Sequence, residues 1–192
     1  LNSEHISVYA FTVEPQSRFY VQGIEPAGLR TQARQYRLVT RLLEENGYRQ
    51  YEISSFAREG KESFHNINYW QGGDYIGLGM AAHSHMSGRR FWNTGRFSDY
   101  VQRVTKGLSP VEGREELAAE ERLREGLLVG LRMNAGVSLQ AIEKRFACRL
   151  GAPRRAVLRE LTDTGFLRRH KGRLQATDKG RLVLDEISAR LV

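Results

Sequence analysis

The densest group of chemically versatile side chains lies at residues 65–70, which read His-Asn-Ile-Asn-Tyr-Trp. Imidazole can ligate haem iron, and Tyr and Trp offer faces for stacking and polar edges that orient a ligand. Two glycines follow closely, so we expect a glycine-bounded loop that could bind a flat ligand. The alternative is a loop whose rings pack into the core while His65 caps a backbone group.

A second pair of imidazoles, His83 and His85, is separated by one residue. On a strand these two side chains would share one face. Without a cysteine or an evident carboxylate partner nearby, a structural zinc site is not favoured, and we expect one of the two to line a cofactor pocket. Glu52 and Asp74 could serve as acid or base, but nothing in the sequence brings them together, so structural roles are favoured for both.

Two further features have simple explanations. Residues 77–82 match the G-x-G-x-x-A pattern of a dinucleotide site, yet no long apolar strand precedes them and polar and glycine residues interrupt the required helix. We interpret these glycines as places where the backbone closely approaches a ligand or a neighbouring strand. Cys148 lies near an expected helix end, and we expect it to be a buried small hydrophobic residue rather than a nucleophile.

Composition excludes several classes of protein. The 192 residues include one cysteine, which rules out an internal disulfide and a cysteine cage for zinc or an iron–sulfur cluster made within this chain. No apolar run reaches the roughly 18 residues of a membrane span, and there is no signal-peptide pattern. We therefore expect a cytoplasmic protein. Because the sequence begins with Leu1, we also expect a cut or processed fragment.

The positive charge is concentrated in the C-terminal part of the chain. The formal net charge is +8, and the segment from Lys144 to Arg181 contains 12 Lys and Arg against 3 Asp and Glu. Such a block can attract nucleic acid or an anionic ligand such as a propionate-bearing porphyrin. A solvated basic surface is the favoured interpretation.

The N-terminal residues predict a strand, a helix and a second strand. Alternating β-branched and aromatic residues predict the first strand over 5–13, an apolar face predicts a helix over 32–46, and 48–53 forms the second strand. This order favours a parallel α/β layer with a crossover helix. Residues 54–95 are rich in Gly, His, Asn and large rings, and we expect a packed functional region with short strands near 75–78 and 89–92.

The C-terminal residues predict a helix-rich domain. We expect a helix over 97–106, a linker over 107–110 and a long helix over 115–133. The elements that follow have the order of a winged-helix domain: helices over 138–146 and 153–163, strands over 166–169 and 173–176, and a helix capped by Thr177. A DNA-binding version would place its second helix in the major groove and its wing on phosphates; a protein-docking module is the alternative.

A set of sequence motifs extends along the chain, at residues 5–15, 51–58, 65–70, 72–84, 91–94 and 174–182. Together they resemble the oxygen-independent coproporphyrinogen III oxidase-like family of radical S-adenosylmethionine proteins. The resemblance covers essentially all 192 residues. The motif at 65–70 is similar to the haem-chaperone (HemW) branch rather than to the true oxidases (HemN).

This resemblance implies a fold and a division of the chain. Residues 1–110 would be the terminal part of a partial (β/α) barrel with a His- and aromatic-rich loop region, and residues 111–192 a winged-helix-like domain. Such proteins bind a [4Fe–4S] cluster through a C-x-x-x-C-x-x-C motif, whereas Cys148 is the one cysteine here. We therefore expect the cluster ligands to lie before Leu1, no metal ligand or catalytic residue in this chain, and no activity of the chain alone.

The resemblance also implies binding residues. The motif connected with haem handling matches His65, Asn66, Tyr69 and Trp70. The positions where the family approaches S-adenosylmethionine match Thr12, Ala82 and His83, since sites in such barrels gather at the carboxyl ends of strands. The cluster and S-adenosylmethionine belong to the parent protein, and we expect neither these groups nor haem to be held by the present chain alone.

Three functions remain open. The first is haem binding and transfer to an acceptor protein. The second is a portion of a coproporphyrinogen III oxidase, in which S-adenosylmethionine supplies a 5′-deoxyadenosyl radical for oxidative decarboxylation of propionates to vinyl groups. The third, which we do not favour, is a winged-helix nucleic-acid binder. Without the N-terminal barrel half, we expect residues 1–110 to form a homodimer or to be partly disordered, because strand edges and apolar surface would be exposed.

Overall fold

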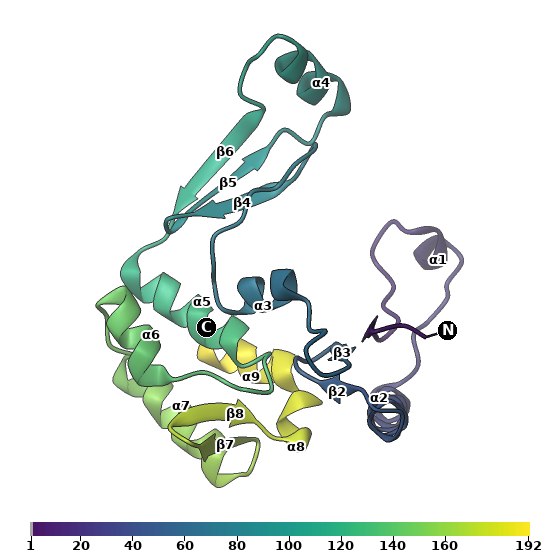
Figure 1. Ribbon diagram of the computed structural model, residues 1–192, viewed down its shortest axis with the longest axis vertical. Helices are drawn as coiled ribbons and strands as arrows, with labels where there is room; N and C mark the ends of the chain where they lie inside the picture. The colour runs from purple at the N-terminus through teal and green to yellow at the C-terminus, as the bar shows by residue number, and fades with distance from the viewer. Residues whose placement is uncertain (1) are drawn as a thin grey trace. The chain divides into compact units, whose positions relative to one another are not determined.

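The computed structural model describes residues 2–192, which form two compact units (Figure 1). The N-terminal unit ends at Ser63, and the C-terminal unit runs from Phe64 to Val192. This division differs from the boundary expected near residue 110. The reason is that strand β6 (Val111–Glu116) pairs with strand β5 (Arg89–Asn93), so a boundary at 110 would separate two hydrogen-bonded strands.

The N-terminal unit contains a three-stranded antiparallel sheet in the order β1-β3-β2. Its strands are β1 (His5–Ser7), β2 (Arg49–Gln50) and β3 (Ser55–Ala57). Both β1 and β2 pair with β3 in antiparallel register, so these two strands run parallel to each other, as expected, but β3 lies between them. The chain reverses after β2, where the Ser55 amide donates to the Glu52 carbonyl, and this reversal returns β3 between its two neighbours.

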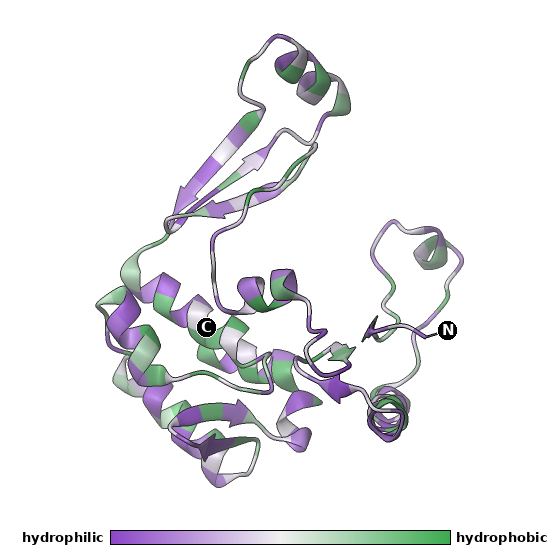
Figure 2. Ribbon diagram, viewed as in Figure 1, coloured by the Kyte–Doolittle hydropathy of each residue, from purple (hydrophilic) through white to green (hydrophobic). Residues whose placement is uncertain are grey.

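The helices of this unit leave apolar side chains in solvent. Helix α2 (Leu29–Glu45) confirms the helix predicted over 32–46, with an earlier start, and the short helix α1 (Arg18–Val21) precedes it. Figure 2 shows hydrophobic and hydrophilic residues interspersed along α2. The predicted strand over 5–13 ends at Ser7. Large exposed apolar residues of the unit include Tyr9, Tyr20, Val21, Leu29, Leu38 and Leu42, whereas Tyr48, Phe56 and Ala57 are buried.

A second antiparallel sheet, in the order β4-β5-β6, follows helix α3 (Phe64–Trp70) in the C-terminal unit. Strand β4 (His83–Met86) joins β5 through a tight turn at Ser87 and Gly88, both with positive φ, as a two-residue hairpin favours. The strand predicted at 89–92 is confirmed by β5. Near the one predicted at 75–78, Tyr75 forms an isolated bridge to His85.

The segment after the sheet differs from the long helix predicted over 115–133. Helix α4 (Phe97–Thr105), predicted over 97–106, leads into β6, and helix α5 begins at Ala119 and ends at Gly130. Residues 111–116 are extended because they continue the sheet, with Glu115 opposite Arg90. The Arg90–Glu115 ion pair, 2.7 Å long, bridges the two strands at that register.

The remaining elements follow the predicted order of helix, helix, hairpin and helix. They are α6 (Leu139–Phe146), α7 (Ala152–Asp163), β7 (Leu167–His170), β8 (Arg173–Ala176), α8 (Asp178–Arg181) and α9 (Leu184–Leu191). The predicted caps are confirmed, because the hydroxyls of Ser138 and Thr177 accept backbone N–H groups of α6 and α8. The final helix is interrupted after Arg181. Among residues 2–192, no helix has both the length and the apolar character that crossing a membrane demands.

Buried leucines of α5, α7 and α9 form the core of the C-terminal unit. Leu127 on α5 is 0% exposed, so the Leu127→Ala substitution should lower the free energy of unfolding by about 2–5 kcal/mol through lost burial and a residual cavity. Urea denaturation followed by circular dichroism measures this loss. The matched control Leu108→Ala, at a position 58% exposed, should change stability by less than about 0.5 kcal/mol. Equal effects of the two substitutions would contradict this assignment of the core.

Candidate functional site

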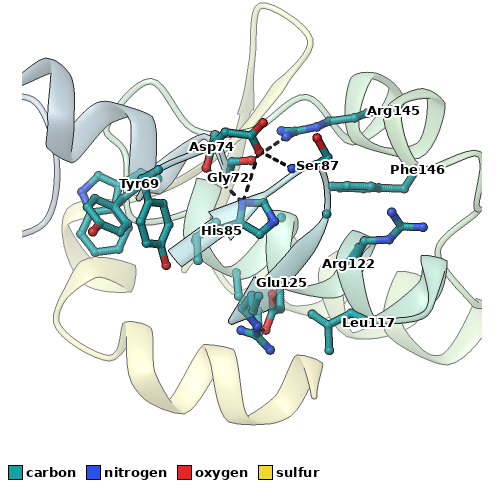
Figure 3. A pocket seen from close by; sticks show the side chains of 18 residues that line it. Tyr69, Gly72, Asp74, His85, Ser87, Leu117, Arg122, Glu125, Arg145 and Phe146 are labelled. Carbon is teal, nitrogen blue, oxygen red and sulfur yellow. Dashed lines mark hydrogen bonds and ion pairs between the residues drawn. The ribbon is translucent and has the colours of Figure 1, made fainter. Parts of the chain in front are cut away.

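A cavity of about 650 Å³ opens in the C-terminal unit (Figure 3). Its walls come from the end of α3 and the turn that follows, from the β4–β5 hairpin, and from α5 and α6. The volume lies within the roughly 300–1,000 Å³ typical of small-molecule sites. Apolar side chains line it together with aromatic and charged ones: Leu117, Leu128, Val129, Phe146, Tyr69, Trp70, Tyr75, Asp74, His85, Arg90, Arg122, Glu125 and Arg145.

The motif at residues 65–70 is helical and forms most of α3, so the expected glycine-bounded loop is wrong. Helical geometry brings residues four apart onto one face, and the rings of His65 and Tyr69 accordingly meet edge to face with centroids 4.7 Å apart. Tyr69 and Trp70 line the cavity, whereas His65 and Asn66 lie outside its lining. The structure therefore brings the second half of the predicted haem motif to the cavity wall and leaves His65 exposed.

Asn68 ties the following turn to the end of α3. Its carbonyl accepts the Gly73 N–H at 2.9 Å, and its side-chain Nδ2 donates to the Asp74 carbonyl at 2.9 Å. A Cβ on Gly73 would overlap the Asn68 carboxamide, so this close approach requires glycine. The motif thus contributes a residue that positions the turn, in addition to the rings it contributes to the cavity.

Arg145 fastens the same turn to α6. Its guanidinium donates to the carbonyl oxygens of Gln71 and Gly72, both at 2.6 Å, and lies 5.1 Å from the centroid of the Phe146 ring. Figure 3 shows Arg145 reaching across to Gly72 beside Asp74. The turn is therefore held both from α3 and from a helix more than seventy residues later in the chain.

His85 lies on the cavity wall with one ring nitrogen already engaged. Its Nδ1 is 3.1 Å from the Gly73 carbonyl oxygen and 3.8 Å from the Asp74 carboxylate. A carbonyl can only accept a hydrogen bond, so Nδ1 carries the proton and Nε2 keeps its lone pair in the neutral ring. The same carboxylate accepts the Ser87 N–H at 2.9 Å. This arrangement leaves Nε2 as a nitrogen that can bind a metal ion or accept a proton.

Aromatic rings connect α3 with His85. The ring centroids of Tyr69 and Tyr75 are 4.3 Å apart, and those of Tyr75 and His85 are 6.1 Å apart. Burial raises the pKa of the Tyr75 phenol, and the neighbouring Tyr69 adds to the shift. The cavity therefore presents a continuous set of ring surfaces suited to stacking on a flat ligand.

The residues expected near S-adenosylmethionine lie outside the cavity lining. His83 shares a face of β4 with His85, as two such residues on a strand must, and its ring stacks on Trp92 with centroids 5.6 Å apart. The carbonyl of Ala82 accepts the Asn93 N–H at 3.0 Å. Thr12 is an exposed residue of the N-terminal unit.

The other residues considered in the sequence analysis, Gly77, Glu52 and Cys148, lie outside the cavity lining. The close approach expected at the glycines of 77–82 is confirmed, since a Cβ on Gly77 would overlap the His83 carbonyl. Glu52 is buried in the N-terminal unit. Cys148 is half-buried rather than buried, because it follows the left-handed Ala147 that ends α6. Throughout residues 2–192, no three His, Cys, Asp or Glu side chains gather where they could hold a metal ion.

Sequence reasoning missed the contributions of α5 to the cavity. Arg122 and Glu125 are three residues apart and share a helix face, with Leu117 just before the helix. That spacing was visible in the sequence. What could not be seen is that this face lies against the hairpin and α3, which end more than twenty residues before α5 begins.

Comparison with known proteins identifies the family. A family model described as the HemN C-terminal domain matches residues 117–183. Heme chaperone HemW of Bacillus subtilis is 32% identical over 191 residues, covering 97% of this chain and 50% of that protein. Heme chaperone HemW of Mycobacterium tuberculosis is 31% identical over 194 residues, covering 98% and 47%. A solved structure of coproporphyrinogen III oxidase (HemN) from Escherichia coli, which is described as a radical SAM enzyme, matches with a TM-score of 0.77 at 18% identity, covering 99% of this chain and 48% of that one.

These matches define a mixed α/β chain whose fold resembles about half of the HemN structure. More particularly, the chain is HemN/HemW-like and corresponds to the C-terminal portion of such proteins, which confirms the resemblance found in the sequence. It spans about half the length of the curated relatives it matches.

The raised pKa of Tyr75 predicts a specific titration. In a chain labelled with ¹³C at tyrosine Cζ, the NMR signal of Tyr75 should titrate at a higher pH than 10.0, the ordinary pKa of the phenol. Because the folded state disfavours the phenolate, this group's contribution to stability is present below pH 10.0, its ordinary pKa, and is lost as pH rises through the raised value. Titration of the Tyr75 signal at the ordinary phenol pKa would show that the phenol is not shielded from water as described.

Proposed function

We propose that this chain binds haem, or a closely related porphyrin, for transfer to an acceptor protein. The observation that carries the proposal is the cavity of about 650 Å³ walled by Tyr69 and Trp70 of the 65–70 motif. Ring faces, apolar side chains and a few charged groups are what a flat amphipathic ligand requires. Curated relatives named heme chaperone HemW, which match along nearly the whole chain, support it.

Two imidazoles are candidates for the bond to iron. The motif favours His65, which lies on the turn of α3 before Tyr69, together with Asn66 as a neighbouring polar group. The cavity geometry favours His85, whose Nδ1 is engaged by a backbone carbonyl and whose Nε2 keeps its lone pair. Both belong to the C-terminal unit, and the His65→Ala and His85→Ala variants distinguish them.

The location of the cavity changes one expectation. The sequence led us to expect no haem on this chain alone, but all the lining residues belong to the C-terminal unit, residues 64–192. A site complete within one compact unit does not need the N-terminal barrel half. We therefore propose that haem binding is a property of the present chain.

A second candidate is the corresponding portion of a coproporphyrinogen III oxidase, and the fold similarity to HemN favours it. In the parent, the cluster and S-adenosylmethionine would supply radical chemistry, and Thr12, Ala82 and His83 remain our candidates for residues near S-adenosylmethionine. A cluster of this type needs three cysteines, and Cys148 is the one cysteine of the sequence. The residues present therefore do not fit the cluster, and we derive no catalytic step for this chain.

The fold of each unit also suggests what the chain contacts in the parent protein. We propose that residues 1–63 are the end of a partial barrel, whose exposed Tyr20, Leu29 and Leu38 would be covered by the N-terminal barrel half or by a second copy of the chain. The helix, helix, hairpin and helix order supports a winged-helix-like assignment for the C-terminal part. Location in the cytoplasm stays a prediction.

Nucleic acid is not proposed as the partner of the basic block. Two of the three arginines on α7, the helix that would enter DNA, are engaged within the chain: Arg154 contacts Glu120 and the Leu191 carbonyl, and Arg155 pairs with Glu143. Their charges are therefore compensated by carboxylates and backbone rather than left for phosphates.

Histidine variants test the proposed function directly. Haem titrated into the chain should give a saturable change in the Soret band. Removing the imidazole that ligates iron should abolish the histidine-ligated spectrum and weaken binding by roughly tenfold or more. His65→Ala and His85→Ala are compared with His170→Ala, a matched control at an exposed position of β7. Unchanged spectra for both His65→Ala and His85→Ala would contradict the proposal.

A further inference from the structure

We propose that Arg122 anchors a carboxylate of the ligand that occupies the cavity. This inference rests on the proposed function and specifies how its site recognises the ligand. It concerns the charged end of the ligand, whereas the aromatic motif and the imidazoles concern its flat body and its metal.

Arginines other than Arg122 that line the cavity already have partners. Arg90 pairs with Glu115 at 2.7 Å and with Glu125 at 2.9 Å. Arg145 donates both terminal nitrogens to backbone carbonyls of the turn after α3. Neither cation is therefore available to a ligand without breaking a contact that holds the walls together.

Arg122 differs from these two arginines. No hydrogen bond or ion pair of its guanidinium nitrogens is found among residues 2–192, and its Nε is buried, as the Nε of Arg90 is too. The contact found for the guanidinium is with the Phe146 ring, 6.0 Å from the centroid. The two carboxylates that line the cavity have partners other than Arg122: Asp74 accepts the Ser87 N–H, and Glu125 pairs with Arg90. Among the residues that the structure describes, Arg122 is thus the cation of the cavity lining that has neither a hydrogen-bond nor an ion-pair partner.

The surroundings hold this cation in place. A Cβ on Gly88 would lie 2.8 Å from the Nη1 of Arg122, so the glycine of the hairpin turn leaves room for the guanidinium. Figure 3 shows Arg122 beside Phe146 and Leu117 at one side of the cavity. A half-buried guanidinium against apolar groups is weakly hydrated, and a carboxylate that reaches it gains a charge-assisted hydrogen bond.

These features specify the chemical class of the ligand. It should carry a carboxylate on an apolar aromatic body, because the guanidinium lies over the Phe146 ring and the same cavity is lined by Leu117 and Val129. The propionate of a porphyrin has this character. An ester of the same porphyrin keeps the flat body and the iron but lacks the charge, so it isolates the contribution of Arg122.

The experiment compares haem with haem dimethyl ester. Wild-type chain should bind haem roughly 10- to 100-fold more tightly than the ester, the range expected for a hydrogen bond to a charged group. Arg122→Met should weaken haem binding by the same factor, leave ester binding unchanged and so abolish the preference. Arg122→Lys should restore part of it. Arg114→Met, which removes the same charge from an exposed position of β6, should keep the wild-type preference.

The outcomes that would overturn the inference are distinct. Equal weakening of haem and ester binding in Arg122→Met would show a structural role, and a retained preference would show that the carboxylate binds elsewhere. Circular dichroism and thermal unfolding verify that the variants fold. Failure of the wild-type chain to bind either compound would overturn the proposed function itself, together with this inference.

Discussion

The turn after α3 is the constraint on which the cavity depends. Asn68 holds the backbone of this turn from within the aromatic motif, and Arg145 holds it from α6. This segment also places the Gly73 carbonyl against Nδ1 of His85, and its Asp74 carboxylate accepts the Ser87 N–H of the hairpin. A displacement of this short segment would therefore alter the ring wall, the imidazole tautomer and the hairpin contact together. Side chain to backbone bonds are individually modest, but here they converge on one stretch of chain.

Charge in this protein is a poor guide to function until the contacts are known. The basic block from Lys144 to Arg181 dominates the sequence, yet several of its arginines serve internal contacts, as Arg145 and Arg155 do. Arg122 lies outside the block, and its guanidinium remains without an anionic partner among the described residues. The functional significance of a cation thus depends on which carboxylates the fold brings to it, and net charge does not report that.

Local signals in the sequence were sufficient to predict much of the secondary structure of the C-terminal part. Ser138 and Thr177 predicted their caps, and Lys171-Gly172 predicted the β7–β8 hairpin. The errors arose where distant segments decide the structure. Residues 111–116 have charged residues suited to a helix, but pairing with β5 makes them a strand. In the N-terminal unit, β1 and β2 run parallel, as expected, but β3 lies between them and pairs with both in antiparallel register.

The site could be predicted in part for the same reason. The types of Tyr69 and Trp70 indicated a flat ligand, and the histidine pair indicated that one imidazole would face it; the structure places His85 on the cavity wall. The helical state of 65–70 was missed, because its short length and low content of strong helix formers give a weak propensity. Arg122 was missed because nothing local distinguishes it from the other arginines of the chain.

The central claim is that haem is bound inside the cavity of the C-terminal unit. A crystal structure of the chain with haem, with anomalous diffraction recorded at the iron edge, tests it most directly. We expect an iron peak inside the cavity bounded by Tyr69, Phe146 and His85, with a propionate directed at Arg122. An iron peak on the outer surface of α3 or in the N-terminal unit, with the cavity unchanged, would contradict it.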